Sequence, residues 1–149
     1  MSLALVDLDG TVADYHGAMM SAMEAIRSPG EAPFASFADT ERPTWMEARR
    51  TLISTQPGFW RNLPRLEAGF HVVGALRSCG FELHVLTKGP SSKHAAWAEK
   101  VEWVRAHLPG VDLTITEDKS LTYGRVLVDD FPPYYLGWLA HRPRGVAIV

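Results

Sequence analysis

The chain opens on the stretch that decides its fold, Leu3-Ala4-Leu5-Val6-Asp7-Leu8-Asp9-Gly10-Thr11. A short apolar run is typical of a buried strand, and this one runs into two carboxylates, Asp7 and Asp9. Residues two apart in a strand point to the same side, so we expect both carboxylates to face one point just beyond the strand's carboxyl end. Gly10 lets the backbone turn away there, at the edge where ligands bind in open α/β sheets.

Two neighbouring carboxylates repel each other unless a positive charge lies between them, and Mg²⁺ is a hard cation that suits oxygen ligands. The simpler interpretation is a strand end followed by an Asp-Gly turn, because such dipeptides are common in turns. The order Asp-x-Asp-Gly-Thr directly after an apolar strand is more specific than a turn signal. It favours a metal site at the end of this strand.

The composition is that of an ordinary globular chain, with 149 residues, 46% of them hydrophobic and 21% charged. This length fits one domain, or one domain with a modest insertion. The net charge of −2 gives no electrostatic footprint for a nucleic-acid polymer or an anionic membrane. The single cysteine, Cys79, excludes an intrachain disulfide and fits a reducing compartment. With no apolar stretch of membrane-spanning length and no signal peptide before Asp7, we expect a cytoplasmic protein.

The pattern of apolar residues predicts strands that alternate with helices. Strands are expected in the run before Asp7 and over residues 81–86, 112–116, 125–128 and 145–149. Helices are expected over residues 14–26, 44–54, 66–78, 92–107 and 132–141. This alternation implies a parallel sheet with right-handed crossovers, which collects the carboxyl ends of all strands at one edge.

Residues 15–62 are expected to form a small, mostly helical insertion, with a core domain made of residues 1–14 and 63–149. The insertion is rich in aromatic side chains: Tyr15, Phe34, Phe37, Trp45, Phe59 and Trp60. Most of them are expected to pack as the insertion's own small core. A cap also presents a surface to the site that it covers, and flat aromatic side chains there would suit a planar group such as a nucleobase.

Four expected strand ends carry chemically active side chains. In chain order they are Asp7 with Asp9, Thr87, Lys119, and Asp129 with Asp130. Each has an ordinary explanation when taken alone: a turn, a cap, a surface ion pair or a solvated loop acid. Together, at one edge of a parallel sheet, the acids could hold a cation. The hydroxyl and backbone N–H groups at the second strand end could hold a phosphoryl oxygen.

This order of motifs resembles the four motifs of the haloacid dehalogenase-like (HAD) phosphohydrolases. Nearly the whole chain is similar to one family among them, the 5'(3')-deoxyribonucleotidases, which dephosphorylate nucleoside monophosphates. The similarity rests on the segments Asp7 to Asp14, Pro57 to Trp60, Lys100 to Val104, Thr116 to Lys119 and Val126 to Asp130. The resemblance implies an α/β fold with a Rossmann-like (HAD-type) parallel sheet flanked by helices and a small helical cap after the first strand.

The resemblance also implies roles for individual residues. Asp7 is expected to be the nucleophile that forms an aspartyl-phosphate, and Asp9 the general acid and base. Mg²⁺ is expected to bind the side chains of Asp7 and Asp130 and the backbone carbonyl of Asp9. Asp129 is expected to support this site without binding the ion directly. The other expected site residues are Thr87, Lys88 and Lys119 for the phosphate, Lys100 and Thr11 as alternatives or supports, and Tyr15, Trp45 and Trp60 for the base. Lys88 stands where the family usually has a serine.

Three alternatives stay open at this point. The chain could be a HAD phosphatase for another small phosphate ester, such as a sugar phosphate. It could be a relative that binds the ligand without catalysis, although all the expected acids are present. A receiver-type signalling domain also uses acids, a Thr and a Lys at strand ends, but needs its phosphorylated Asp near the middle of the chain. The sequence leaves the oligomeric state, monomer or homodimer, open as well.

Overall fold

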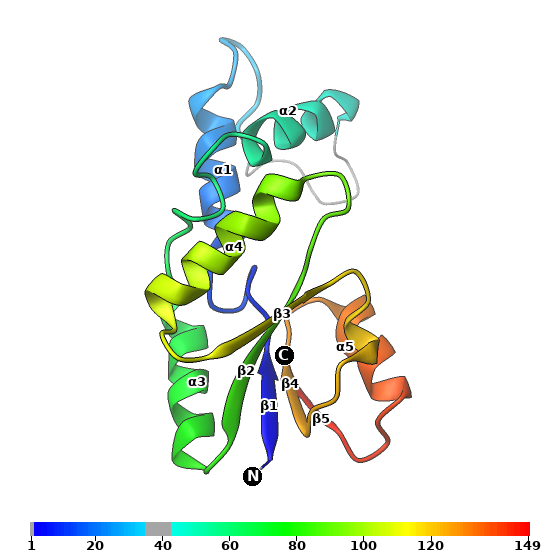
Figure 1. Ribbon diagram of the computed structural model, residues 1–149. Helices are drawn as coiled ribbons and strands as arrows, with labels where there is room; N and C mark the ends of the chain where they lie inside the picture. The colour runs from blue at the N-terminus through cyan, green and yellow to red at the C-terminus, as the bar shows by residue number, and fades with distance from the viewer. Residues whose placement is uncertain (1, 35–42) are drawn as a thin grey trace.

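The computed structural model describes residues 2–34 and 43–149 and contains a single five-stranded sheet (Figure 1). All neighbouring strands are parallel, in the order β3-β2-β1-β4-β5. The strands are β1 (Leu3–Val6), β2 (Glu82–Lys88), β3 (Asp112–Thr116), β4 (Val126–Val128) and β5 (Val146–Ile148). The predicted Rossmann-like parallel sheet is therefore confirmed.

In the described ranges, five α-helices and the short 3-10 helix η2 connect the strands. They are α1 (Tyr15–Ala25), α2 (Thr44–Ser54), α3 (Glu67–Ser78), α4 (His94–His107), η2 (Lys119–Leu121) and α5 (Pro132–Ala140). These helices follow the predicted ranges closely, because their apolar spacing and the Gly and Pro residues at their ends were clear signals. No helix of the described residues is long and apolar enough to span a membrane.

The central strand β1 is buried because helices cover both faces of the sheet. On one face, Ala4 and Val6 belong to a large apolar cluster that includes Trp103 of α4 and Val73 of α3. On the other face, Leu5 packs with Leu86, Leu127 and Trp138 of α5. This two-sided burial explains why β1 is an unbroken apolar run and not an alternating one.

The register brings the ends of the middle strands level. Val6 of β1 pairs with Val85 of β2 and with Val128 of β4. Asp7 and Asp129 therefore leave adjacent strands at the same height. The chain builds β2 and β3 on one side of β1, and then β4 and β5 on the other. The gap between β1 and β4 is the switch point where α/β sheets bind ligands.

Strand β2 is longer than the sequence predicted. The pattern indicated residues 81–86, whereas the strand continues to Lys88. The extra residues are held by β3, because Thr87 pairs with Ile115 and Lys88 with Thr116. Thr87 consequently belongs to the last part of the strand and not to the loop after it.

Helices α1 and α2 lie together beyond the carboxyl edge of the sheet (Figure 1). They share a separate apolar cluster whose buried members are Met19, Met23, Phe34, Met46 and Ile53. The methionines of α1 thus serve packing, as the helical spacing suggested. Phe37, one of the aromatic residues assigned to this region, lies outside the described residues.

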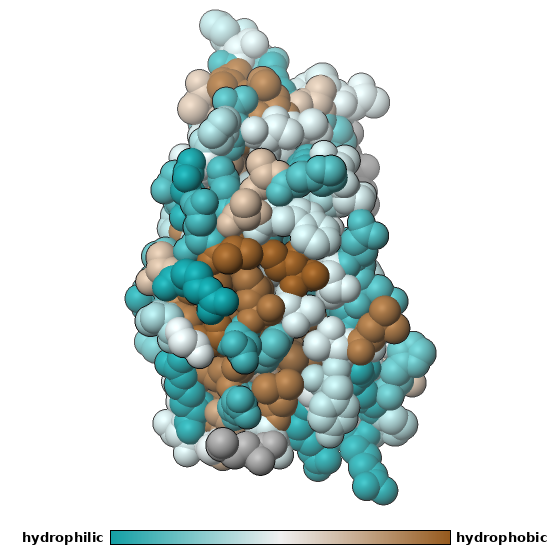
Figure 2. All heavy atoms as spheres, viewed as in Figure 1, coloured by the Kyte–Doolittle hydropathy of each residue, from teal (hydrophilic) through white to brown (hydrophobic). Residues whose placement is uncertain are grey.

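The edge strand β3 is less covered than the middle of the sheet. Its Leu113 and Ile115 are only half-buried. Figure 2 shows hydrophobic residues gathered across the middle of the face that it displays, below the region of α1 and α2. Polar residues surround this area on the same face.

Candidate active site

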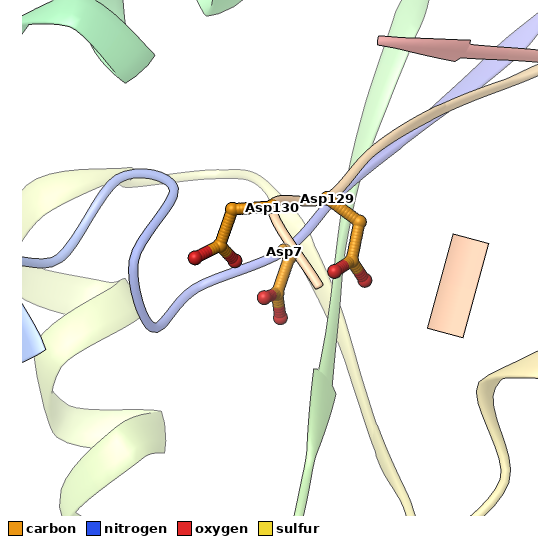
Figure 3. A group of neighbouring side chains, drawn as sticks. All are labelled: Asp7, Asp129 and Asp130. Atoms are coloured by element: carbon orange, nitrogen blue, oxygen red, sulfur yellow. The ribbon is translucent and has the colours of Figure 1, made fainter. Parts of the chain in front are cut away.

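Three carboxylates meet at the switch point of the sheet. One oxygen each from Asp7, Asp129 and Asp130 can be chosen so that all three lie within 4.8 Å of one another. Figure 3 shows Asp7, which follows β1, between Asp129 and Asp130, which follow β4. Asp7 and the pair Asp129 and Asp130, more than a hundred residues apart in the sequence, thus come together in space.

Gly10 makes this close approach possible. Its φ of +82° lies in the left-handed region that favours glycine. A Cβ atom added to Gly10 would lie 2.3 Å from Oδ2 of Asp130, which is far inside van der Waals contact. The loop after Asp9 therefore needs a glycine here for two reasons, backbone conformation and space.

Lys119 is buried against two of the three acids. Its Nζ lies 2.5 Å from Oδ1 of Asp7 and 2.7 Å from Oδ2 of Asp129. The other oxygen of Asp129 accepts a hydrogen bond of 3.0 Å from the backbone N–H of Phe131. Both oxygens of Asp129 therefore already have protein partners, whereas Asp130 is oriented toward the solvent-accessible side of the group.

One lysine does not balance this negative charge. Burial is the main reason why the pKa of Asp7 rises to about 7; the Lys119 ammonium opposes this shift, while Asp129 and Asp9 add to it. Burial also raises the pKa of Asp130. A site of hard oxygen donors that is short of positive charge is the chemical environment that a divalent cation such as Mg²⁺ fits.

Lys100, on α4, organises the other half of the site. Its buried Nζ lies 2.5 Å from Oδ2 of Asp9, donates to Oγ1 of Thr87 at 3.1 Å, and donates to the carbonyl of Lys88 at 2.7 Å. Since Thr87 accepts this hydrogen bond, its own hydroxyl hydrogen is left to donate elsewhere. Oδ1 of Asp9 is buried and has no hydrogen-bond partner among the described residues.

Asp7 and Asp9 therefore contact different lysines, although strand alternation predicted that they face one point. The reason is that β1 ends at Val6, so the period of two no longer applies where Asp9 lies. Asp9 makes a local bridge to Ala13 in the turn instead. The two carboxylates still line the same cavity.

This cavity has a volume of about 310 Å³. Its lining residues are Asp7, Asp9, Tyr15, Arg50, Trp60, Lys88, Lys119, Asp130, Phe131 and Tyr134. The sequence analysis named seven of these ten and missed Arg50, Phe131 and Tyr134. Phe131 comes directly after the acidic pair at an expected strand end, so the same rule that found Asp130 could have found it, whereas Tyr134 lies in the first turn of α5. No sequence signal pointed to Arg50, which lies in the middle of α2.

Tyr15 and Trp60 form an aromatic wall of the cavity. Their rings are stacked, with centroids 5.3 Å apart and an angle of 20° between the planes. Trp60 is only 7% exposed, and the Nζ of Lys100 lies 4.9 Å from its ring centroid. Trp60 is thus part of the main core, and Tyr15 is packed against that core too.

Trp45 was expected in the same pocket, but the structure does not bring it there. It packs beside Phe34, with ring centroids 5.8 Å apart, and under the guanidinium of Arg49. Trp45 is not among the residues that line the cavity. Its place in α2 points it to the small cluster that α1 and α2 share.

Two further expected residues lie at the margin of the site. Lys88 lines the cavity with its Nζ 5.3 Å from the ring centroid of Tyr134. Thr11 lies in the turn after Asp9, and its hydroxyl oxygen is buried without a hydrogen-bond partner in the described part of the chain. The carbonyl of Thr11 faces Gly69 so closely that a Cβ atom at that position would lie 1.8 Å away, so α3 is packed tightly under this turn.

Glu99 fixes the segment that carries Trp60, and the sequence analysis missed it. Its buried carboxylate accepts hydrogen bonds from the backbone N–H groups of Gly58 at 2.6 Å, Trp60 at 3.0 Å and Arg61 at 3.3 Å. A charged residue in the middle of an amphipathic helix gives no hint of such a role. Glu99 thereby ties one end of the 15–62 segment to α4.

A parallel sheet in this order, with an Asp pair after the first strand, a Thr, a Lys and a second Asp pair at the following strand ends, is the arrangement of the HAD-type fold. Solved structures share this fold. A haloacid dehalogenase-like hydrolase from Burkholderia xenovorans LB400 aligns with a TM-score of 0.53 and 15% identity over 97% of this chain and 78% of that chain. The HAD-hydrolase YfnB from Bacillus subtilis, described as bound to magnesium, aligns with a TM-score of 0.56 and 12% identity over 98% of this chain and 85% of that one.

Within that class, the chain belongs to the family of 5' nucleotidases described as deoxy (pyrimidine), cytosolic type C, whose family model matches residues 1–142. It is also 33% identical, over 141 residues, to a protein of Bordetella bronchiseptica that bears the name of a 5'(3')-deoxyribonucleotidase. That match covers 87% of this chain and 74% of the relative. A relative in Bordetella pertussis with the same name matches at the same level. The chain is therefore a HAD-type nucleotidase.

Proposed function

We propose that the protein is a Mg²⁺-dependent phosphomonoesterase that hydrolyses deoxynucleoside monophosphates through an aspartyl-phosphate on Asp7. The observation that carries the proposal is the group of Asp7, Asp129 and Asp130, whose oxygens lie within 4.8 Å of one another beside a buried lysine. Membership of the nucleotidase family supports the substrate class. The chain has a single cysteine and so no intrachain disulfide, which supports a location in the reducing cytoplasm.

The residues present fit a magnesium ion. Their donors are carboxylate oxygens, which hard cations prefer, and the raised pKa of Asp7, caused mainly by burial, indicates a need for positive charge. Asp7 and Asp130 would hold the ion with the backbone carbonyl of Asp9. Both oxygens of Asp129 already accept hydrogen bonds from Lys119 and Phe131, so Asp129 would support the site without binding the ion directly. The bound ion supplies charge neutralisation between a carboxylate nucleophile and a phosphate dianion.

In the first step, an oxygen of the Asp7 carboxylate attacks the phosphorus of the substrate. A bond forms between Asp7 and phosphorus while the bond from phosphorus to the sugar oxygen breaks. Two moderate displacements thus replace one very slow hydrolysis. The contact of 2.5 Å between Lys119 and Asp7 holds the nucleophile in place and leaves a cation beside the oxygens of the transferred group.

Asp9 is the proposed proton carrier. It gives its proton to the departing sugar oxygen, and it then takes a proton from the water that attacks the aspartyl-phosphate, so that Asp7 is regenerated. Lys100 fixes Asp9 through Oδ2, and the unpartnered Oδ1 is the atom left to exchange the proton. The hydroxyl of Thr87, oriented by Lys100, and the ammonium of Lys88 would bind the remaining phosphoryl oxygens.

Residues 15–62 are the proposed cap over a core made of residues 1–14 and 63–149. The separate apolar cluster of α1 and α2 supports this division. The stacked pair Tyr15 and Trp60, together with Phe131 and Tyr134, gives the cavity flat apolar walls. Such walls favour a nucleoside, with its flat base, over a plain sugar as the group attached to the phosphate.

The test is a panel of phosphate esters with the purified protein and its Asp7→Asn variant. We expect deoxynucleoside monophosphates to be hydrolysed with Mg²⁺ and not with EDTA, and the variant to lose more than about 10³-fold in kcat. Rapid quenching in acid should trap a phosphorylated wild-type chain and an unmodified variant. Turnover of sugar phosphates alone would reject the nucleobase pocket, and hydrolysis that survives in the variant would reject the nucleophile.

A further inference from the structure

A second cavity, of about 440 Å³, lies at the amino ends of β4 and β5. Two short segments line it, residues 123–125 before β4 and residues 141–145 between α5 and β5. Val126 pairs with Val146, so the two segments reach the sheet at the same height. Figure 1 shows the 141–145 loop, in red, at the end of the molecule away from α1 and α2. This cavity is therefore separate from the candidate active site, which lies at the carboxyl ends of the strands.

The lining of this second cavity is strongly basic. Its charged and titratable members are Arg125, His141, Arg142 and Arg144. None of the described residues that line it is acidic. The carboxylate of Asp118, whose pKa is lowered chiefly by its hydrogen bond with Ser120 and to a smaller extent by His141, does not line the cavity. The three arginines thus give the basic cavity a charge of about +3 at neutral pH, which no described lining side chain cancels.

The three guanidinium groups have few partners within the protein. The side chains of Arg125 and Arg144 are exposed and make no hydrogen bond or ion pair with residues 2–34 and 43–149. Arg142 is held in place, because its Nη1 donates to the carbonyl of Ser120 at 2.6 Å. Its Nε is buried and has no hydrogen-bond partner among the same residues. A partly buried cation without a counter-ion is unfavourable, so an anion in the basic cavity would stabilise this arrangement.

The amount of positive charge indicates the kind of anion. A single phosphate group carries about −1.5 to −2 charges at pH 7, which is less than the arginines offer. Arginine forks bind phosphate oxygens in pairs, so three of them match a chain of at least two phosphates better than one phosphate.

An aromatic ring stands beside the arginines. Tyr123 lines the basic cavity, is 74% exposed and has no ring contact within the described part of the chain. Nucleobases stack on exposed aromatic rings next to positively charged groups that hold their phosphates. The ring and the charge together therefore favour a nucleotide with a phosphate chain over an inorganic anion.

We propose that the basic cavity is a second ligand site, which binds the phosphate chain of a nucleoside diphosphate or triphosphate through its three arginines. The base of this ligand stacks on Tyr123. The ligand is a separate molecule from the substrate of the active site, because the two sites lie at opposite edges of the sheet. This inference does not depend on the proposed function, since binding here needs neither the metal nor hydrolysis.

The test is titration calorimetry with ADP, pyrophosphate and orthophosphate in EDTA. Without a metal the carboxylates of the active site repel phosphates, so binding there is disfavoured. We expect pyrophosphate to bind at least about 10-fold more tightly than orthophosphate. Each of Arg125→Gln and Arg144→Gln should weaken the binding of ADP and pyrophosphate about 10-fold or more. Tyr123→Ala should weaken ADP about 5- to 150-fold, the range of one stacked base, and leave pyrophosphate unchanged.

The matched control is Arg77→Gln. Arg77 is an exposed arginine in the last turn of α3 that does not line the basic cavity, so this variant should bind ADP as the wild type does. The substituted side chains at positions 123, 125 and 144 are exposed, and an unchanged Tm shows that these variants are folded.

Three results would overturn the proposal. The wild type may fail to bind ADP, or bind it no more tightly than the two arginine variants, which removes the site. Equal affinities for orthophosphate and pyrophosphate exclude the phosphate chain. Equal ADP affinities of Tyr123→Ala and the wild type exclude the stacked base. The ester panel with Mg²⁺ tests the proposed function separately, so the two inferences can fail independently.

Discussion

Lys119 places its ammonium nitrogen 2.5 Å from Oδ1 of Asp7, and both side chains are buried. Lys119 is the first residue of the 3-10 helix η2, which follows β3, and Asp7 follows β1 at the centre of the sheet. The same nitrogen is 2.7 Å from Oδ2 of Asp129. Lys119 is thus the only cation within 4 Å of Asp7 and Asp129 in the described part of the chain, and the stability of the site depends on it.

Removal of Lys119 should destabilise the metal-free protein strongly. Lys119→Met leaves two buried carboxylates without their partner, and breaking a buried ion pair costs about 3–5 kcal/mol. Urea unfolding in EDTA measures this loss, and adding Mg²⁺ should restore part of it. As a control, Lys93→Met removes a lysine from the start of α4 whose partner is the hydroxyl of Ser54. A loss in Lys119→Met no larger than in this control would contradict the assigned role.

Asp7→Asn should make the metal-free protein more stable at neutral pH. Burial raises the pKa of Asp7 from 3.8 to about 7, so the ionised side chain is disfavoured in the folded state. The resulting loss in the free energy of unfolding is absent below about pH 4, grows as the pH rises toward 7, and stays constant above that. Thermal unfolding in EDTA should therefore show a Tm advantage of the variant that appears between these pH values.

The exposed Asp112 provides the control for this pH series, because Asp112→Asn removes an equal charge at the start of β3. Its Tm difference from wild type should not follow the same pH course. With Mg²⁺ present, the wild type should regain the stability that the variant has without metal. If Asp7→Asn and the wild type had the same Tm at pH 8 in EDTA, the ionised Asp7 side chain would not destabilise the folded protein, and the inference would be wrong.

Gly10→Ala should impair the site beyond its effect on the backbone. The added Cβ atom would lie 2.3 Å from Oδ2 of Asp130, which forces that carboxylate out of the acidic group. We expect a lower kcat and a higher Mg²⁺ concentration for half-maximal activity. The matched control is Gly30→Ala, since Gly30 has the same type of φ, +85°, but no atom within 4 Å of the added Cβ.

Gly30→Ala should therefore lose about 1 kcal/mol of stability from the left-handed backbone alone and keep its Mg²⁺ dependence. Activity titrations with Mg²⁺ for both variants separate the effect of backbone strain from the effect of the contact between the added Cβ atom and Asp130. Equal Mg²⁺ dependence in the two variants would show that the approach of Gly10 to Asp130 is not what forms the site.

Glu99→Gln should loosen the segment that carries Trp60. The neutral amide keeps one acceptor oxygen, so it cannot serve the three backbone N–H groups that the carboxylate now holds. The expected loss of stability is about 1–3 kcal/mol, with an increase in KM for nucleotides that exceeds any change in kcat. Glu102→Gln is the control, because the one ion pair of Glu102 within residues 2–34 and 43–149 is with the exposed Arg61. An unchanged KM in Glu99→Gln would limit Glu99 to a packing role.

The chain alone determined the scaffold and most of the groups at its edge. Apolar runs such as Leu3 to Val6 and Val126 to Val128, each ending in an acidic pair, are local signals, and they predicted a parallel sheet with its acids at one edge. The positions of Asp7 and Asp129 follow from this, because residues that leave adjacent parallel strands at the same register must be neighbours. Thr87 was found by the same rule.

The tertiary structure decided which side chains contact one another. Lys119 binds Asp7 while Lys100 binds Asp9, Trp45 packs away from the cavity, and Arg50 enters it. These outcomes depend on how α2 and α4 lie over the sheet edge and on the course of the turn after Val6. Strand and helix periods fix the direction of a side chain within its own element only, so contacts between elements come from packing of the whole chain.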